Sequence, residues 1–317
     1  MSRAEAALGV DVGGTSTKAA LVTRTGEVLA RAERPTDPTA GTKGVLTIAE
    51  DLLLRAGAAG AEVVAIGVGA AGFVDASSGA VTFAPNLAYD DPQIAAALRA
   101  RFGLPVVVDN DANCAAWGER AFGSARGSDH VSLLTLGTGV GGGFVVDGRL
   151  LRGYTGAGAE AGHIVIDIDG PRCPCGLRGC LEQFASGSAI ARMAREAVER
   201  DPASTILAFA GTRDEITAEH VAKAARQLDE SARAVLRRAG RALGIGLSNL
   251  VNLFDPEVIV LGGSVVKAGE PFLGPARDEL QRSTLAQRRR AQRLDVSALG
   301  NDAGILGAAA LAFDEAS

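Results

Sequence analysis

The chain has 317 residues, of which 47% are hydrophobic and 22% charged, so it is a globular protein long enough for two domains. Its 32 basic and 37 acidic residues give a formal net charge of −5, which argues against nucleic acid as a partner. No apolar run reaches the roughly 18 residues of a membrane span, and the N-terminus lacks the features of a secretory signal. We therefore expect a cytoplasmic protein with neither a membrane nor a nucleic-acid partner.

The first part of the chain predicts a strand-rich block. Strands are expected over 6–12, 17–23 and 27–33, joined by the turn-forming sequences GGTS and TRTGE. Apolar spacing predicts a helix over 43–58, and a buried strand is expected over 63–70.

The chain then alternates between helix and strand. A helix over 91–103 is expected to begin near a capping Asp and to stop at Gly103, and a strand over 105–110 leads directly into a helix over 111–122. The later strands are expected at 130–137, 142–148, 149–153, 257–263 and 293–300, with a hairpin turn at Asp147-Gly148. The later helices are expected near 186–200, 217–227, 229–252, 270–283 and 302–314.

This alternation predicts the α/β class. Two stretches have the same order of apolar strand, small-residue turn and second strand: LGVDVGGTSTKAALV and LTLGTGVGGGFVVDG. They open two successive blocks, which indicates an internal duplication with a cleft between the halves.

The first glycine turn, DVGGTSTK, is neither a Walker A loop nor a GxGxxG motif. Gly13 and Gly14 can adopt positive φ and leave backbone N–H groups bare, and Thr15 and Thr17 add hydroxyls, so the turn can hold phosphate oxygens. Asp11 could hold Mg²⁺ through water. A plain β-turn explains this motif alone equally well.

The second glycine turn favours nucleotide binding. Gly137, Thr138 and Gly139 begin the related block, and two such turns could clamp one nucleotide. A third patch, Gly262 and Gly263, follows a strand, as expected for a loop beside an adenosine.

Three polar residues follow the strand over 105–110, in the sequence VVVDNDAN. Ligands gather at strand carboxyl ends in open α/β sheets, and a kinase needs a carboxylate near the reacting hydroxyl. Asp111 is the candidate general base. The alternative is a helix N-cap, which Asp109 and Asn113 fit better.

Cys173, Cys175 and Cys180 lie within eight residues, ten residues after His163. In a reducing compartment this spacing favours a closed Cys3His zinc site with a structural role over a disulfide or simple burial. Cys114 is expected to be a small buried hydrophobe.

Two glutamates flank the cluster, Glu160 three residues before His163 and Glu182 two residues after Cys180. Zinc would tie the two segments together and set the spacing of two carboxylates suited to sugar hydroxyls. His163 could bind zinc through one ring nitrogen and a sugar hydroxyl through the other. Ordinary solvated charge is the alternative for both glutamates.

Five stretches in this order resemble the ROK family of repressors, open reading frames and sugar kinases: DVGGTSTKAALV, PVVVDNDANCAAWGE, LTLGTGVGGGFVVDGRLLRG, GAEAGH and CPCGLRGCLE. The resemblance covers nearly the whole chain and is strongest to the bacterial glucokinases of the family. It implies the actin-like ATPase (ribonuclease H-like) fold, with two lobes and a central cleft. One lobe would be 1–109, joined by the C-terminal helix 303–317. The other would be 110–302, which includes the zinc knuckle, the cysteine-bearing segment 173–180.

The resemblance also implies a function: ATP with Mg²⁺ phosphorylates glucose at its 6-hydroxyl, as the entry step of glycolysis, in a homodimer or homotetramer. The phosphates would lie over 13–15 and 137–139, and the CxCGxxGCxE signature would bind structural zinc. Asp111 would be the general base. The sugar contacts would be Gly72, Asn86, Asn110, Asp111, Glu160, His163 and Glu182.

Three other functions stay open at this point. A ROK kinase for another hexose, such as N-acetylmannosamine or fructose, would share almost every motif. A sugar-responsive repressor would carry a helix-turn-helix segment, for which the position of Asp11 leaves no room, so this chain would be a regulator lacking its DNA-binding domain. A non-catalytic sugar-binding protein would not need Asp111 or the two glycine turns.

Overall fold

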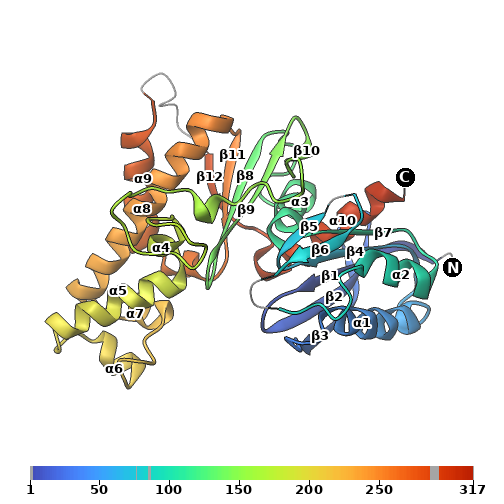
Figure 1. Cartoon of the computed structure of the whole chain (residues 1–317), viewed down its shortest axis with the longest axis horizontal. Helices are drawn as coiled ribbons and strands as arrows, with labels where there is room; N and C mark the ends of the chain where they lie inside the picture. The colour runs from blue at the N-terminus through green and yellow to red at the C-terminus, as the bar shows by residue number, and fades with distance from the viewer. Residues whose placement is uncertain (1–2, 76, 85–86, 286–292, 317) are drawn as a thin grey trace. The chain divides into compact units, whose positions relative to one another are not determined.

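The computed structural model describes residues 3–75, 77–84, 87–285 and 293–316 (Figure 1). The chain divides into two compact units, the first made of 1–133, 143–159 and 297–317 and the second of 134–142 and 160–296. The lobe boundary expected between residues 109 and 110 stays a prediction, as does the central cleft.

The first unit contains a five-stranded sheet in the order β3-β2-β1-β4-β7. Its strands are β1 (Ala4–Val12), β2 (Ser16–Thr23), β3 (Val28–Pro35), β4 (Ala61–Ala70) and β7 (Val106–Asn110). The first three strands are antiparallel, while β4 pairs in parallel with both β1 and β7. The predicted strands of this block are therefore confirmed.

Successive residues of β1 point to opposite faces of this sheet, and both faces are buried by packed helices. Leu8 belongs to the core that contains Ile48 and Leu52 of helix α1 (Gly41–Ala56). Ala7 belongs to a second core, formed with the C-terminal helix α10 (Ala303–Glu315). The end of the chain therefore completes the unit that its beginning forms.

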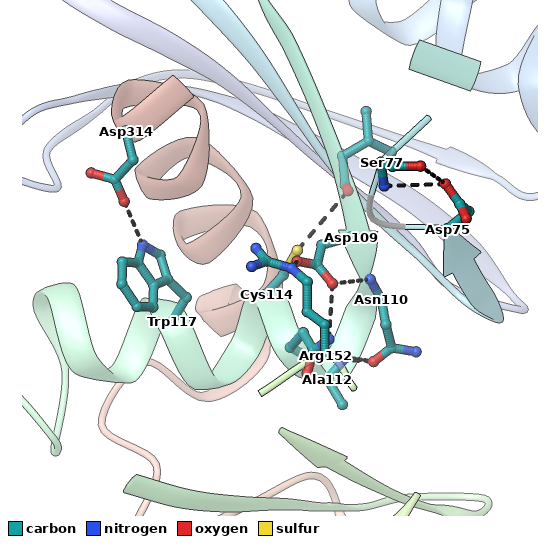
Figure 2. Close-up of polar contacts among 11 residues, drawn as sticks. Asp75, Ser77, Asp109, Asn110, Ala112, Cys114, Trp117, Arg152 and Asp314 are labelled. Carbon is teal, nitrogen blue, oxygen red and sulfur yellow. Dashed lines mark hydrogen bonds and ion pairs between the residues drawn. The ribbon is translucent and has the colours of Figure 1, made fainter. Parts of the chain in front are cut away.

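Glycines allow α10 to approach the sheet and helix α3 (Asp111–Phe122) very closely. A Cβ at Gly67 of β4 would lie 1.8 Å from the Ala308 carbonyl oxygen, and a Cβ at Gly307 would lie 1.6 Å from that of Cys114. The Trp117 indole also donates to Asp314 at 3.1 Å, linking α3 to α10 (Figure 2). Cys114 is fully buried, which confirms its predicted packing role.

The second sheet has the order β10-β9-β8-β11-β12, which repeats the strand order of the first. Its strands are β8 (Val131–Leu136), β9 (Val140–Val146), β10 (Arg149–Leu150), β11 (Val258–Gly262) and β12 (Arg293–Val296). The matching orders confirm the predicted duplication. Asp147 and Gly148 have φ values of 51° and 70°, as the predicted hairpin turn requires. β10 and β12 are shorter than expected.

The second unit is mainly helical. Its long helices are α5 (Gly187–Arg200), α7 (Ala218–Arg226), α8 (Glu230–Phe254) and α9 (Glu270–Ser283), all of which were predicted. α8 packs against the other three. The side chains of Ser186, Thr217 and Asp229 cap α5, α7 and α8, which explains where these helices begin.

Short elements escaped the sequence analysis: the β5 (Phe73–Asp75) and β6 (Ala80–Phe83) hairpin, α4 (Glu182–Ala185) and α6 (Ile206–Ala210). The predicted Asp cap of helix α2 (Ile94–Phe102) is wrong, because Gln93 is its N-cap and makes no side-chain bond. Among the described residues, every helix is too short or too polar to cross a membrane.

Replacement of glycine by alanine should have opposite effects on the free energy of unfolding at two helical positions, because only one of them is closely packed. Gly307→Ala should destabilise the protein by about 1–3 kcal/mol, because the new methyl overlaps the Cys114 carbonyl. Gly44→Ala in α1, which meets no atom within 4 Å, should stabilise it by up to about 1 kcal/mol. Denaturant unfolding measures both; equal effects would contradict the packing described here.

Candidate active site and metal centre

The turn from β7 into α3 is built around the Asn110 side chain (Figure 2). Its Oδ1 accepts from the backbone N–H of Ala112 at 2.9 Å and of Asn113 at 3.2 Å, and its Nδ2 donates to the Gly72 carbonyl at 3.0 Å. Asn110 is therefore the N-cap, and the expectation that Asp109 or Asn113 caps this helix is wrong.

Asp109 is a buried anion with a full set of partners. Its Oδ1 accepts from the backbone N–H of Asn110 and from the Asn113 amide, both at 2.8 Å. Its Oδ2 accepts from Arg152 Nε at 2.7 Å, and its side chain is only 5% exposed. Arg152 was not predicted as part of the site, because nothing in the chain order pairs residue 152 with residue 109. The ion pair holds the start of the Asp109–Asp111 segment in place.

Asp111 is the first residue of α3, and its Oδ1 accepts from the Ala112 N–H at 2.9 Å. Burial raises its pKa. Burial and then the charge of Asp111 also raise the pKa of Asp11 to about 7, and burial followed by the same two carboxylates raises that of Tyr89. Two poorly solvated carboxylates make this a place where a cation such as Mg²⁺ would be stabilised.

The first glycine turn joins β1 to β2, with the Gly13 N–H donating to the Ser16 carbonyl at 3.1 Å. Positive φ is not used at Gly13 or Gly14, contrary to expectation. What the turn offers a phosphate is the open space where Gly14 lacks a Cβ. Thr15 is exposed and stays a predicted contact.

Thr17 supports this turn from beneath. Thr36 donates its one hydroxyl hydrogen to the Gly13 carbonyl at 2.7 Å, so in the 3.0 Å contact between the two threonines Thr17 is the donor. The hydroxyl hydrogen of Thr17 is therefore already used within the protein, and the side chain is buried. Its predicted phosphate contact is not the role that this geometry favours.

The second glycine turn lies at the N-terminus of α5. The Gly137 N–H donates to the Gly139 carbonyl at 3.0 Å, and the Gly137 carbonyl accepts from Gly187 at 2.7 Å. A cavity of ≈ 730 Å³ opens beside it. The cavity is lined by Gly137, Thr138, Gly187, Ser188, Ile190, Ala191, Arg195, Ile216, Thr217, Ala218, Glu219, Ala222, Arg226, Leu236, Ser264, Val265, Lys267 and Ala268.

This lining includes two predicted nucleotide contacts, Gly137 and Thr138, and two residues that directly follow the predicted pair Gly262 and Gly263. Backbone N–H groups at a helix start suit phosphates. The walls contributed by α5 and α7 carry no sequence motif, so the sequence analysis did not find them.

The four predicted metal ligands come together. The ligand atoms of His163, Cys173, Cys175 and Cys180 all lie within 4.8 Å of one another. Cys175 Sγ and Cys180 Sγ are 3.7 Å apart, and so are Cys173 Sγ and His163 Nδ1. The predicted convergence is confirmed.

These distances fit a tetrahedral metal site. Zinc–sulfur bonds of about 2.3 Å place two sulfurs of a tetrahedron about 3.8 Å apart, whereas a disulfide needs about 2.05 Å. Burial and the neighbouring thiols raise the pKa of Cys180 to about 12, so a bound cation is what would let these thiols ionise together. The residues fit Zn²⁺ held by four protein ligands, and zinc itself stays a prediction.

The two flanking glutamates differ in their contacts. Glu160 Oε2 lies 3.9 Å from His163 Nε2, the ring nitrogen that faces away from Cys173. Glu182 Oε2 accepts from the Val140 backbone N–H at 3.0 Å. Neither glutamate is simply solvated.

The predicted sugar contacts fall into two groups. Gly72, Asn110 and Asp111 belong to the first unit, and Glu160, His163 and Glu182 belong to the second. Asn86 lies outside the described residues. The roles of all of them stay predictions.

The chain is similar to known proteins over nearly its whole length. The ROK family model matches residues 7–315. The glucokinase of Streptomyces coelicolor is 40% identical over 311 residues, 96% of each chain. The ROK family glucokinase of Streptomyces griseus, solved with glucose and AMPPNP, superposes with a TM-score of 0.82 at 40% identity, covering 98% of this chain and 99% of that one. The ROK hexokinase of Thermus thermophilus superposes with a TM-score of 0.84 at 35% identity, covering 98% of both.

The two matching sheets define an α/β protein with the two-lobed actin-like ATPase fold. Within that class, the chain belongs to the ROK family.

The metal site predicts one equivalent of zinc in the purified protein. Cys180→Ser should lose most of it, because removal of one ligand opens the closed site. Cys114→Ala is the matched control and should keep full zinc, since Cys114 lies outside the cluster. Elemental analysis without prior chelator decides; less than about half an equivalent in the unaltered protein would contradict the site.

Proposed function

We propose that this protein is an ATP-dependent glucokinase, which transfers the γ-phosphoryl group of ATP to the 6-hydroxyl of glucose. The family, and 40% identity to a glucokinase over 96% of each chain, support the reaction. The glycolytic role, the cytoplasmic location and the dimeric or tetrameric state stay predictions.

The observation that carries the mechanism is the environment of Asp111. The Asn110 cap and the Asp109–Arg152 pair fix the backbone on which Asp111 stands. Burial raises its pKa and so makes it a stronger base than a solvated carboxylate. In the proposed step Asp111 accepts the proton of the sugar hydroxyl while that oxygen attacks the γ-phosphorus, the bond from the γ-phosphorus to the β,γ-bridging oxygen breaks, and ADP leaves. Phosphoryl transfer depends mainly on positioning and charge neutralisation, so a modest base is sufficient.

The nucleotide would be bound through both glycine turns. We assign the phosphates to the open backbone at Gly14 and to the turn over Gly137–Gly139, and the adenosine to the cavity beside α5. Asp11 would hold Mg²⁺ through water, in surroundings that already disfavour a bare carboxylate. When bound, Mg²⁺ would neutralise the negative charge of the phosphates.

The sugar contacts on the second unit are assigned to Glu160, His163 and Glu182. When bound, zinc would fix the spacing of the segments that carry these residues. His163 directs Nδ1 toward the sulfurs and Nε2 toward Glu160, so one ring serves both the knuckle and the sugar side. A carboxylate pair with such an imidazole can accept and donate several hydrogen bonds to vicinal hydroxyls.

A kinase acting on another hexose is the second candidate, because the chain is also 35% identical to a ROK hexokinase over 98% of both chains. Turnover measured across glucose, mannose, fructose and N-acetylmannosamine separates the two. A kcat/KM for another sugar that exceeds the value for glucose would replace the proposed substrate.

Asp111→Asn should lower kcat by about 10²–10⁴-fold, since the amide cannot accept the proton. Glucose and nucleotide binding should change little, because the amide keeps the size of the carboxylate. Asp278→Asn, which removes an exposed charge from α9, is the control and should retain full activity. Steady-state kinetics with calorimetric binding would contradict Asp111 as the base if Asp111→Asn kept its turnover.

The raised pKa of Asp111 predicts an acid limb in kcat/KM. Activity should fall as the pH drops through this pKa, at a pH above the value of about 3.9 for an ordinary Asp. Ionisable groups near it in the described part of the chain include Asp11, Tyr89, Cys114 and the Asp109–Arg152 pair. The limb should be absent from the residual activity of Asp111→Asn, which keeps all of these; an unchanged limb in that variant would assign it to another group.

A further inference from the structure

Val140, at the end of the second glycine turn, is held by both segments that carry metal ligands. Its N–H donates to Glu182 Oε2 at 3.0 Å, and Glu182 follows Cys180 by two residues. Its carbonyl oxygen lies against Gly162, where a Cβ would stand only 2.1 Å away, and Gly162 directly precedes His163. Val140 therefore contacts both of the segments that a bound metal would join, one through its N–H and the other through its carbonyl oxygen.

Gly139 shows that the glutamate has a fixed place beside the turn. A Cβ at Gly139 would lie 2.5 Å from Glu182 Oε2, closer than nonbonded atoms approach. A side chain at Gly139 would therefore have to displace the carboxylate, and backbone conformation is not the reason for the glycine, because the φ of Gly139 is not in the left-handed region.

The other end of the turn is tied as well. The Gly137 carbonyl accepts from Gly187 at the start of α5, and Gly137 and Thr138 line the cavity assigned to the nucleotide. The turn is therefore clamped by α5 at Gly137 and by Glu182 at Val140. Among the described residues, none donates a hydrogen bond to the second carboxylate oxygen of Glu182.

We infer that Glu182 is a positioning residue for the nucleotide-binding turn, in addition to its assigned sugar contact. One carboxylate oxygen fixes the turn through Val140, and the other remains for a sugar hydroxyl. The inference rests on the proposed function, in which this turn binds phosphate. It means that the metal knuckle acts on nucleotide binding even when no sugar is present.

The test separates the length of the Glu182 side chain from its charge. Glu182→Gln keeps an oxygen at the right distance to accept from Val140, so the affinity for a non-hydrolysable ATP analogue with Mg²⁺ should stay within about twofold. Glu182→Asp keeps the charge but is shorter by one methylene, and Glu182→Ala has no acceptor. Both should weaken nucleotide binding about tenfold in calorimetry without sugar.

A charge role alone predicts a different order. If Glu182 acted only as an anion near the phosphates, its removal in Glu182→Gln and Glu182→Ala would tighten nucleotide binding by relieving repulsion. Glu62→Ala is the control: it removes an exposed glutamate of β4 that lies outside the assigned sites, and it should leave sugar-free nucleotide affinity unchanged. Zinc content is measured for every variant, and affinities are compared for protein with equal zinc.

A double-mutant cycle gives a second readout that does not depend on one variant. Gly139→Ala should weaken nucleotide binding in the unaltered protein, because its methyl displaces the carboxylate. In the Glu182→Ala background that methyl has room, so the further loss should be at least threefold smaller. Additive losses would overturn the inference, as would nucleotide affinity unchanged in both Glu182→Asp and Glu182→Ala. The proposed function fails separately, by absence of glucose phosphorylation in the unaltered protein.

Discussion

The convergence of one imidazole and three thiols is the constraint on which the second unit depends. His163 comes from one segment and the three cysteines from another, yet their ligand atoms lie within 4.8 Å. Burial raises the pKa of Cys173, and burial with the neighbouring thiols raises that of Cys180 to about 12, so these two thiols resist ionisation. A bound divalent cation would stabilise the thiolates and so favour ionisation of the cysteines. It would also crosslink the segment that carries His163 to the segment that carries the cysteines. Every polar group argued to meet the sugar on this unit stands within three residues of a ligand in the sequence.

In the first unit, the candidate catalytic residue is positioned without a metal. There a buried ion pair, Asp109 with Arg152, and an Asn110 cap fix the strand-to-helix turn that carries Asp111. α10 packs against β1, β4 and α3 at distances that only small residues permit. Burial raises the pKa of Asp111, although the hydrogen bonds from the backbone and from Asn110 oppose that rise. Packing and a buried ion pair therefore fix the position of Asp111 in the first unit. In the second unit, the metal knuckle would fix the positions of the residues assigned to the sugar.

The sequence predicted the parts of this molecule whose signal is local. The strand, turn and helix over 105–122 were predicted from an apolar run that ends in polar residues. The convergence of the cysteines was predicted from their spacing, and tight turns at Gly176 and Gly179, both with positive φ, bring them together. The repeated hairpin motif predicted the duplication that the two strand orders confirm. The prediction of which residue caps α3 was wrong. Asp109, Asn110 and Asn113 are all good capping residues, and only their tertiary partners decide among them.

What the sequence could not predict depends on contacts between distant residues. Arg152 pairs with Asp109 across 43 positions, and Glu182 meets Val140 across 42. Neither pair has a spacing rule. Gly139 reads as a phosphate-loop glycine in the sequence, whereas the structure shows a carboxylate in the space its side chain would fill. Thr17 likewise reads as a phosphate ligand but donates to Thr36.

The most direct test of the whole account is a crystal structure with glucose and a non-hydrolysable ATP analogue, recorded with anomalous scattering at the zinc edge. We expect one zinc peak surrounded by His163, Cys173, Cys175 and Cys180, with Asp111 in hydrogen-bond contact with the 6-hydroxyl of the sugar. Absence of the zinc peak, or an Asp111 carboxylate directed away from that hydroxyl, would contradict it.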